Sequence, residues 1–105
     1  MMGEIARIEA AKVAPGTAVR IEGGPDGVCL VRVGDDFYAI ADRCSHADVR
    51  LSEGEVDEDE RSVECWKHGS TFSLLDGSPQ SLPATQPVAV YEVRRDGDDV
   101  VVAEP

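Results

Sequence analysis

The sequence predicts a small all-β protein. Short runs of apolar residues alternate with polar ones, clusters of glycine, proline and aspartate separate these runs, and no stretch has the apolar period of a convincing helix. The chain has 105 residues, of which 42% are hydrophobic, which is enough for one globular domain with one core. We therefore expect a single antiparallel domain over residues 1–105, with about nine short strands.

The N-terminal half contains the clearest strand patterns. Apolar and polar residues alternate from Ala18 to Glu22, as in a half-buried strand, and the residues from Val28 to Val33 form the richest β run. The turn signal after Val33 predicts a hairpin with the next apolar run. The strands expected in this half cover residues 5–8, 18–22, 28–33 and 37–40.

Cys29 shares a face of the third expected strand with Val31 and Val33. This position predicts a small buried hydrophobe, because free cysteine is among the most buried residue types. A further metal ligand or a reactive thiol is the alternative.

Regular alternation fades between residues 42 and 70, which predicts a loop-rich insertion. Short strands are expected at residues 61–64 and 71–75. Three prolines between Ser78 and Pro87 exclude a central strand or a helix interior and predict a stiff loop. A last hairpin is expected from residues 88–93 and 100–103.

Two short motifs in the insertion carry the chemistry. They are Cys44-x-His46 and Cys65-x-x-His68, separated by eighteen residues, and they contain both histidines and two of the three cysteines of the chain. A thiolate is a soft metal ligand and a neutral imidazole a borderline one, so two of each suit zinc or an iron–sulfur cluster. The candidate metal ligands are Cys44, His46, Cys65 and His68.

The charge of the chain limits its partners. With 10 basic and 21 acidic residues, the formal net charge is −11. Such a field repels nucleic acid and anionic membranes, so neither is an expected partner, and it favours basic protein surfaces; solubility alone is the alternative. Six of the eight residues from Glu53 to Glu60 are acidic, and this run predicts either a solvated loop or a guide for a basic partner.

The sequence also predicts a compartment. The start of the chain lacks the basic stretch and apolar run of a signal peptide, and no apolar segment approaches the roughly 20 residues of a membrane-spanning helix. Three cysteines are an odd number, which argues against a secreted disulfide framework. We expect a cytoplasmic protein, because thiols there remain reduced and available to metals.

The order Cys-x-His followed by Cys-x-x-His resembles the Rieske family, in which two histidines replace two cysteines on one iron of a [2Fe–2S] cluster. The resemblance implies an antiparallel β-sandwich or barrel with a loop-rich cluster-binding subdomain and one cluster per chain. It also implies that Cys44 and Cys65 bind the inner iron, whereas His46 and His68 bind the outer iron at the surface. Because imidazole is neutral, such a cluster is reduced more easily than an all-thiolate one.

Further positions refine the resemblance. Gly69 and Ser70 match the family, in which the serine hydroxyl bonds a bridging sulfide. Phe72 stands where the high-potential branch has a tyrosine, and Val49 and Lys67 stand where respiratory members have a pair of disulfide-bonded cysteines. Fewer hydrogen bonds to sulfur and no disulfide predict a reduction potential at the low end of the family range.

This pattern resembles the ferredoxin of bacterial aromatic-ring dioxygenase systems, including the biphenyl type, and residues 51–54 and 82–84 strengthen the resemblance. It implies one-electron transfer from a flavin-dependent reductase to a terminal non-heme iron oxygenase, without a catalytic site or small-molecule substrate in this chain. No histidine remains for the mononuclear iron site of an oxygenase. By analogy Pro83 covers the cluster, with a plain loop proline as the alternative. Trp66 is expected to pack on the domain, with a docking contact as the alternative.

Two other functions compete with this interpretation. A small subunit of another multicomponent reductase, such as nitrite reductase, has the same fold, but many such subunits lack the ligands. A structural zinc domain would use the same four side chains, but zinc folds usually pair cysteines at wider spacings than Cys-x-His. Visible colour distinguishes an iron–sulfur protein from a zinc protein.

Overall fold

The computed structural model describes residues 3–45, 49–67, 69–80 and 86–104. Within these ranges the chain forms nine strands and two short 3₁₀ helices, η1 (Ala10–Lys12) and η2 (Leu51–Glu53). No helix of the described ranges is long and apolar enough to cross a membrane. The strands are β1 (Glu4–Glu9), β2 (Thr17–Ile21), β3 (Val28–Val33), β4 (Asp36–Ala41), β5 (Val56–Asp57), β6 (Ser62–Glu64), β7 (Thr71–Ser73), β8 (Val90–Asp96) and β9 (Asp99–Ala103).

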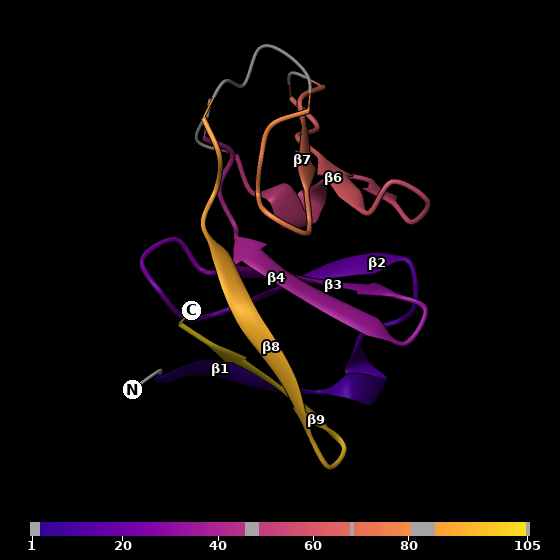
Figure 1. Cartoon of the computed structure of the whole chain (residues 1–105), viewed down its shortest axis with the longest axis vertical. Helices are drawn as coiled ribbons and strands as arrows, with labels where there is room; N and C mark the ends of the chain where they lie inside the picture. The colour runs from indigo at the N-terminus through magenta and orange to yellow at the C-terminus, as the bar shows by residue number, and fades with distance from the viewer. Residues whose placement is uncertain (1–2, 46–48, 68, 81–85, 105) are drawn as a thin grey trace.

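The strands form two antiparallel sheets (Figure 1). The larger sheet has six strands in the order β1-β9-β8-β4-β3-β2, and the smaller has the order β5-β6-β7. The edge strands β1 and β2 of the larger sheet approach each other. A Cβ on Gly23, just after β2, would clash with the carbonyl of Ile5 in β1. The larger sheet is therefore curled toward a barrel, as expected.

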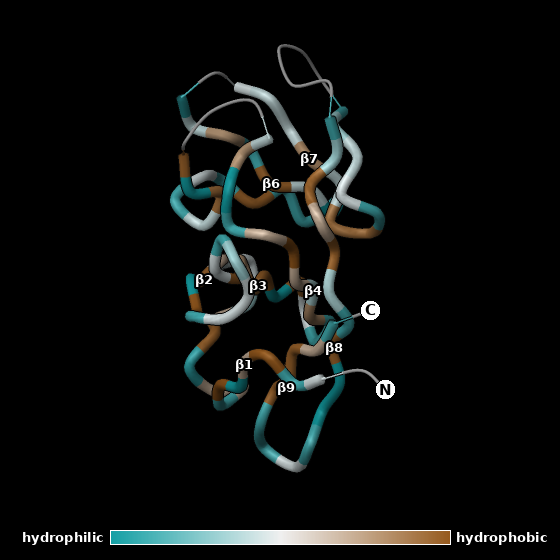
Figure 2. Tube along the Cα trace, turned by 90° about the vertical axis from the view of Figure 1, so that its left-hand side faces the viewer, coloured by the Kyte–Doolittle hydropathy of each residue, from teal (hydrophilic) through white to brown (hydrophobic). Residues whose placement is uncertain are grey.

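Strand β3 separates two apolar cores. Because successive side chains of a strand point to opposite faces, Val28 and Leu30 enter a core within the curled sheet, whereas Cys29 and Val31 enter a core shared with the smaller sheet. Figure 2 shows hydrophobic stretches on the strands and a hydrophilic turn between β8 and β9. The period-two pattern predicted for residues 28–33 thus becomes the wall between both cores.

Arg61 links the smaller sheet to the larger one. Its Nε donates a hydrogen bond to the Tyr38 hydroxyl on β4 at 2.9 Å, and its carbonyl accepts from the Leu74 amide at 2.8 Å. Arg61 ends the turn between β5 and β6 with φ of +48°, a left-handed conformation that is uncommon for residues other than glycine. The turn is thereby directed against β4.

The observed elements agree with the predicted all-β fold. Apart from shifts in strand ends, such as the strand expected at residues 71–75 that ends at Ser73, three differences are notable. Strand β5 lies in the acidic run and was not predicted; its apolar residue, Val56, packs against the shared core. The two 3₁₀ helices were also not predicted. Strand β8 begins at Val90 rather than at residue 88, because the Val88 amide donates to the Gly77 carbonyl at 2.9 Å and not to the sheet.

Gly54 follows η2 and lies directly against the backbone of β6. A Cβ at this position would overlap the carbonyl of Glu64, the residue before Cys65. The adjacent hydrogen bond runs from the Glu64 amide to the Glu55 carbonyl at 2.9 Å. Only glycine therefore permits this approach of η2 to β6.

We expect Gly54→Ala to lower the free energy of unfolding by roughly 1–3 kcal/mol, because overpacking of this contact forces the backbone apart. Gly3→Ala is the matched control, since a Cβ at Gly3 meets no atom within 4 Å and should leave stability unchanged. Urea unfolding followed by far-UV circular dichroism measures both. Equal midpoints for the two variants would contradict the contact.

Candidate metal centre

Cys44 begins a short loop after β4. Its side chain is buried, and its amide donates a hydrogen bond to the Val49 carbonyl at 2.9 Å. This bond closes residues 44–49, the first ligand loop. His46, predicted to be a ligand from this loop, lies outside the described residues, as do residues 47 and 48.

Cys65 begins an equivalent loop directly after β6. It is fully buried, and its amide donates to the Ser70 carbonyl at 2.6 Å. This bond closes residues 65–70, the second ligand loop, in which the predicted ligand His68 lies outside the described residues. The Gly69 amide donates to the Cys65 carbonyl at 2.8 Å, and its φ of +77° suits glycine, as the predicted sharp turn requires.

The two ligand loops are therefore closed in the same way. In each, a buried cysteine donates its amide proton to the carbonyl five residues later. Both cysteines lie in the core shared by the two sheets. Cys44 and Cys65 are the half of the predicted ligand set that lies in the described structure, where no group of three or more histidine, cysteine or acidic side chains is placed to hold a metal ion.

The proline-rich loop is attached to both ligand loops. The Ser45 hydroxyl donates to the Gln86 carbonyl at 2.6 Å, next to Cys44. The Gln80 amide donates to the Thr71 carbonyl at 2.7 Å, just after the second ligand loop. Pro83, the predicted cover, lies outside the described residues together with the rest of residues 81–85.

Trp66 corrects one expectation. It was expected to pack on the domain, but 56% of its surface is exposed. Because the preceding residue, Cys65, occupies the core, the side chain of Trp66 is left at the surface. Lys67 is exposed as well. Ser70, by contrast, is fully buried at the end of the loop, and so is Phe72 in β7. The second ligand loop therefore buries both of its ends and exposes its turn.

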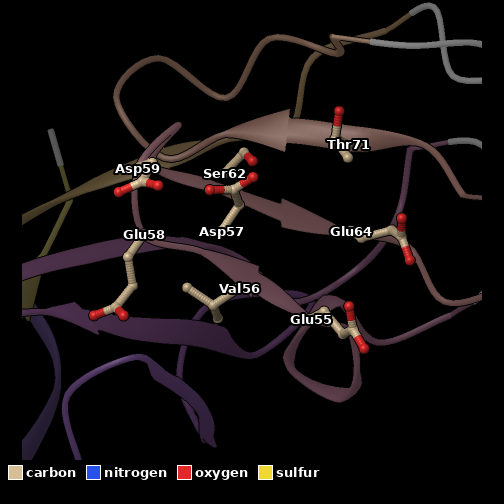
Figure 3. A pocket seen from close by; sticks show the side chains of 8 residues that line it. All are labelled: Glu55, Val56, Asp57, Glu58, Asp59, Ser62, Glu64 and Thr71. Carbon is tan, nitrogen blue, oxygen red and sulfur yellow. The ribbon is translucent and has the colours of Figure 1, made fainter.

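The acidic run forms an open groove beside the smaller sheet. Figure 3 shows carboxylates on several sides of this groove, from β5, the β5–β6 turn and β6. The acidic side chains of the run are exposed, which agrees with a solvated surface. The lining residues are Glu55, Val56, Asp57, Glu58, Asp59, Ser62, Glu64 and Thr71.

Residues 4–92 match the model of the Rieske [2Fe-2S] domain. The chain belongs to the Rieske family. The cofactor implied by this family is a [2Fe–2S] cluster, and the described residues fit it. Two thiols from separate loops lie in one buried region, as a cluster with two thiolate ligands requires.

The Rieske proteins most similar to this chain include components of dioxygenase systems. The ferredoxin component of biphenyl 2,3-dioxygenase from Rhodococcus jostii (strain RHA1) is 42% identical over 86% of this chain and 82% of the relative. The ferredoxin of carbazole 1,9a-dioxygenase from Nocardioides aromaticivorans IC177 has a TM-score of 0.89 and 32% identity over 100% of this chain and 99% of that chain.

Two other solved Rieske structures bear on the predicted alternatives. A chain from the complex of reduced oxygenase and oxidized ferredoxin in carbazole 1,9a-dioxygenase has a TM-score of 0.85 and 38% identity, covering 97% of this chain and 92% of that chain. A chain described as an NADH-dependent nitrite reductase small subunit from Mycobacterium tuberculosis has a TM-score of 0.80 at 24% identity, covering 96% of each chain. The latter likeness shows the fold alone.

Cys29 is fully buried on β3, with Val31 and Ile40 in the same core. Burial raises the pKa of its thiol above the ordinary value, and the negative charge of Asp42 raises it further. The thiol therefore keeps its proton at neutral pH. This confirms the prediction of a small buried hydrophobe.

Asp42 is a buried residue beside the site that the sequence interpretation missed. Its side chain has no exposed surface. The sequence feature that could have identified it is the position of an acidic residue directly after the apolar end of β4 and two positions before Cys44. Such a carboxylate is unusual in an interior unless it is paired.

The raised pKa of Cys29 makes stability depend on alkaline pH. The unfolded chain releases this proton above about pH 8.5, whereas the folded protein retains it, so each further pH unit favours unfolding by up to about 1.4 kcal/mol. Between about pH 8.5 and 10 the wild-type protein should lose about 2 kcal/mol more stability than Cys29→Ala. Urea titrations at several pH values measure the two slopes, and parallel slopes would contradict the shift.

Proposed function

We propose that this chain is a one-electron carrier whose [2Fe–2S] cluster is held by the two ligand loops. Cys44 and Cys65 bind the inner iron, and His46 and His68 bind the outer iron. The observation that carries the proposal is the identical closure of the two loops, each beginning at a cysteine in the same core. Two loops of this kind present a pair of thiolates from one side, as a binuclear cluster needs.

The cluster, when bound, accepts and releases one electron at a time. The chain's own residues keep water from the thiolates, since Cys44 and Cys65 are buried. Trp66 and Lys67 are exposed in the second ligand loop, next to the position of His68. We assign Trp66 to the contact with redox partners, because an exposed tryptophan at an interface provides a large apolar contact.

We place the reduction potential at the low end of the Rieske range. Phe72 has no hydroxyl to donate to a ligand sulfur, and Val49 and Lys67 cannot form the disulfide of the respiratory branch. Hydrogen bonds to sulfur stabilise the reduced, more negative cluster, so fewer of them lower the potential.

The partners follow from the dioxygenase relatives. We propose that a flavin-dependent reductase donates the electron and that a terminal non-heme iron oxygenase accepts it, as the ferredoxin–oxygenase complex of carbazole 1,9a-dioxygenase supports. The oxygenase then performs the catalysis, and this chain binds no substrate. The alternative of a nitrite reductase subunit receives less support, because the likeness to that subunit, at 24% identity, shows the fold alone.

We also propose that residues 1–105 form one domain in the cytoplasm. Strand β9 lies beyond the family match, which ends at residue 92, yet it pairs with β1 along its length. Both ends of the described chain thus belong to the same sheet. All three cysteines lie in the described ranges and none forms a disulfide, which suits a reducing compartment.

Purified protein should contain iron and acid-labile sulfide in equal amounts, about two of each per chain, without stoichiometric zinc. The reduced protein should give a rhombic EPR signal with a low average g value. We expect His46→Ser and His68→Ser to abolish this signal, whereas Lys67→Ser, a matched change within the second ligand loop, should retain it. One zinc and no iron, or an unchanged signal in both histidine variants, would contradict the ligand assignment.

Association with a flavin-dependent reductase from the same cells should slow as salt is added, because steering between exposed charges is screened beyond about 10 Å at 0.1 M. Neutralising three groove carboxylates should slow it several-fold at low salt. Neutralising three exposed acids near the β8–β9 turn and chain ends tests for an effect of net charge alone. Stopped-flow kinetics measures the association rate of each triple variant. The groove variant carries Glu55→Gln, Glu58→Gln and Asp59→Asn, and the control variant carries Glu9→Gln, Asp98→Asn and Glu104→Gln.

Equal slowing by the two triple variants would assign the effect to net charge. A salt-independent rate would leave the acidic residues a role in solubility only.

A further inference from the structure

The carboxylate of Asp42 is buried and engaged on both oxygens. Its Oδ1 accepts a hydrogen bond from the Ser52 amide at 2.7 Å. Its Oδ2 accepts from the Ser52 hydroxyl at 2.7 Å and from Nη1 of Arg20 at 3.0 Å. The side chain of Asp42 has no exposed surface, whereas that of Arg20 keeps 25%. A buried carboxylate persists only where its charge is paired and its oxygens are hydrogen-bonded.

The placement of Arg20 beside this carboxylate has an energetic cost. The Nε of Arg20 is buried and has no hydrogen-bond partner in the described part of the chain. Gly27 lies so close to the guanidinium that a Cβ there would approach its central carbon to 2.6 Å. Nη1 also donates to the Asp26 carbonyl at 3.1 Å. The Asp42 pair is therefore built into the structure and is not a surface contact.

The position of Asp42 connects both ends of the first ligand loop. Asp42 precedes Cys44 by two residues, and its own amide donates to the Gly27 carbonyl at 3.1 Å. Ser52 lies in η2, three residues after Val49, whose carbonyl closes the loop. One carboxylate thus joins the chain entering the loop to the chain leaving it.

The second ligand loop is held differently. It joins β6 to β7, and the residues on either side of it, Glu64 and Thr71, are paired in the sheet. The chain flanking the first ligand loop has no such pairing, because the described residues between the end of β4 and Val56 contain no strand. The Asp42–Ser52 contact takes the place of that missing ladder.

The same contact reaches the second ligand loop through η2. Two residues after Ser52, Gly54 lies against the carbonyl of Glu64, and Cys65 follows directly. Fixing Ser52 therefore fixes the first ligand loop with respect to the second.

We propose that Asp42 is a positioning residue for the [2Fe–2S] cluster. Its hydrogen bonds connect both ends of the first ligand loop and fix the position of that loop relative to the second. The inference rests on the proposed function, because it requires a cluster held between the two loops. Loss of such a supporting contact typically weakens metal retention by about 10- to 100-fold.

The test compares three variants of the cluster-loaded protein. Asp42→Asn removes the negative charge and weakens the contacts with Arg20 and Ser52. Ser52→Ala removes one hydrogen bond to Asp42 and leaves all charges intact. Asp99→Asn is the matched control, because it breaks a different arginine–aspartate pair, Nη1 of Arg7 to Oδ2 of Asp99 at 3.0 Å, on the β1–β9 pair. Cluster loss to a chelator is followed by visible absorbance, folding by far-UV circular dichroism, and cluster geometry by EPR g values.

We expect Asp42→Asn and Ser52→Ala to lose the cluster about tenfold faster than wild type, with the far-UV spectrum retained and the g values shifted before loss. Asp99→Asn should match wild type. Should Asp42→Asn fail to fold, Ser52→Ala alone decides the question, because it keeps the ion pair.

Wild-type rates and g values in Ser52→Ala would overturn the inference, as would cluster loss that occurs only together with loss of the far-UV signal. Wild-type protein that binds no iron would instead overturn the proposed function, and the inference with it. A normal wild-type cluster with unaffected variants overturns the inference alone.

Discussion

The apolar core between the two sheets is the constraint on which the rest of the molecule depends. It contains β3 and β4 side chains from the larger sheet, Val63 and Phe72 from the smaller one, and both cysteines of the ligand loops. Because close-packed interiors leave little room for independent movement, the packing that joins the sheets also places the thiols. The contacts that join the two sheets are therefore also the contacts that place Cys44 and Cys65, the proposed ligands of the inner iron.

The surroundings of the two ligand loops separate two tasks. On their interior side both cysteines, Ser70 and Phe72 are buried, which would keep water away from a cluster bound there. Their exposed side presents Trp66, and the acidic groove lies along the smaller sheet nearby. Brief, salt-sensitive protein complexes need an apolar contact area and charged residues around it. The charges increase the rate of association, and the apolar area stabilises the contact once it forms.

Sequence pattern predicted the strands well because β3 and its neighbours follow a strict two-residue period, and side chains such as Cys29 and Val31 simply follow the pleat. The two cysteines were predicted from motif spacing and a family resemblance, and they lie in one core as a shared centre demands.

Asp42 could not be predicted in this way. Its partners, Arg20 and Ser52, come from β2 and η2, and only the tertiary fold brings them together. Trp66 was misjudged for a similar reason, because hydrophobicity alone does not reveal that Cys65 already fills the core.

The two ends of the described chain meet at the larger sheet, where the Glu104 amide donates a hydrogen bond to the Gly3 carbonyl at 3.0 Å. In Figure 1 they lie beside β1 and β9, away from β6 and β7. A linker joined to either end would leave the tryptophan-bearing face unobstructed. The protein could thus be fused to a flavoprotein or tethered to an electrode while the face proposed to exchange electrons stays turned toward solution.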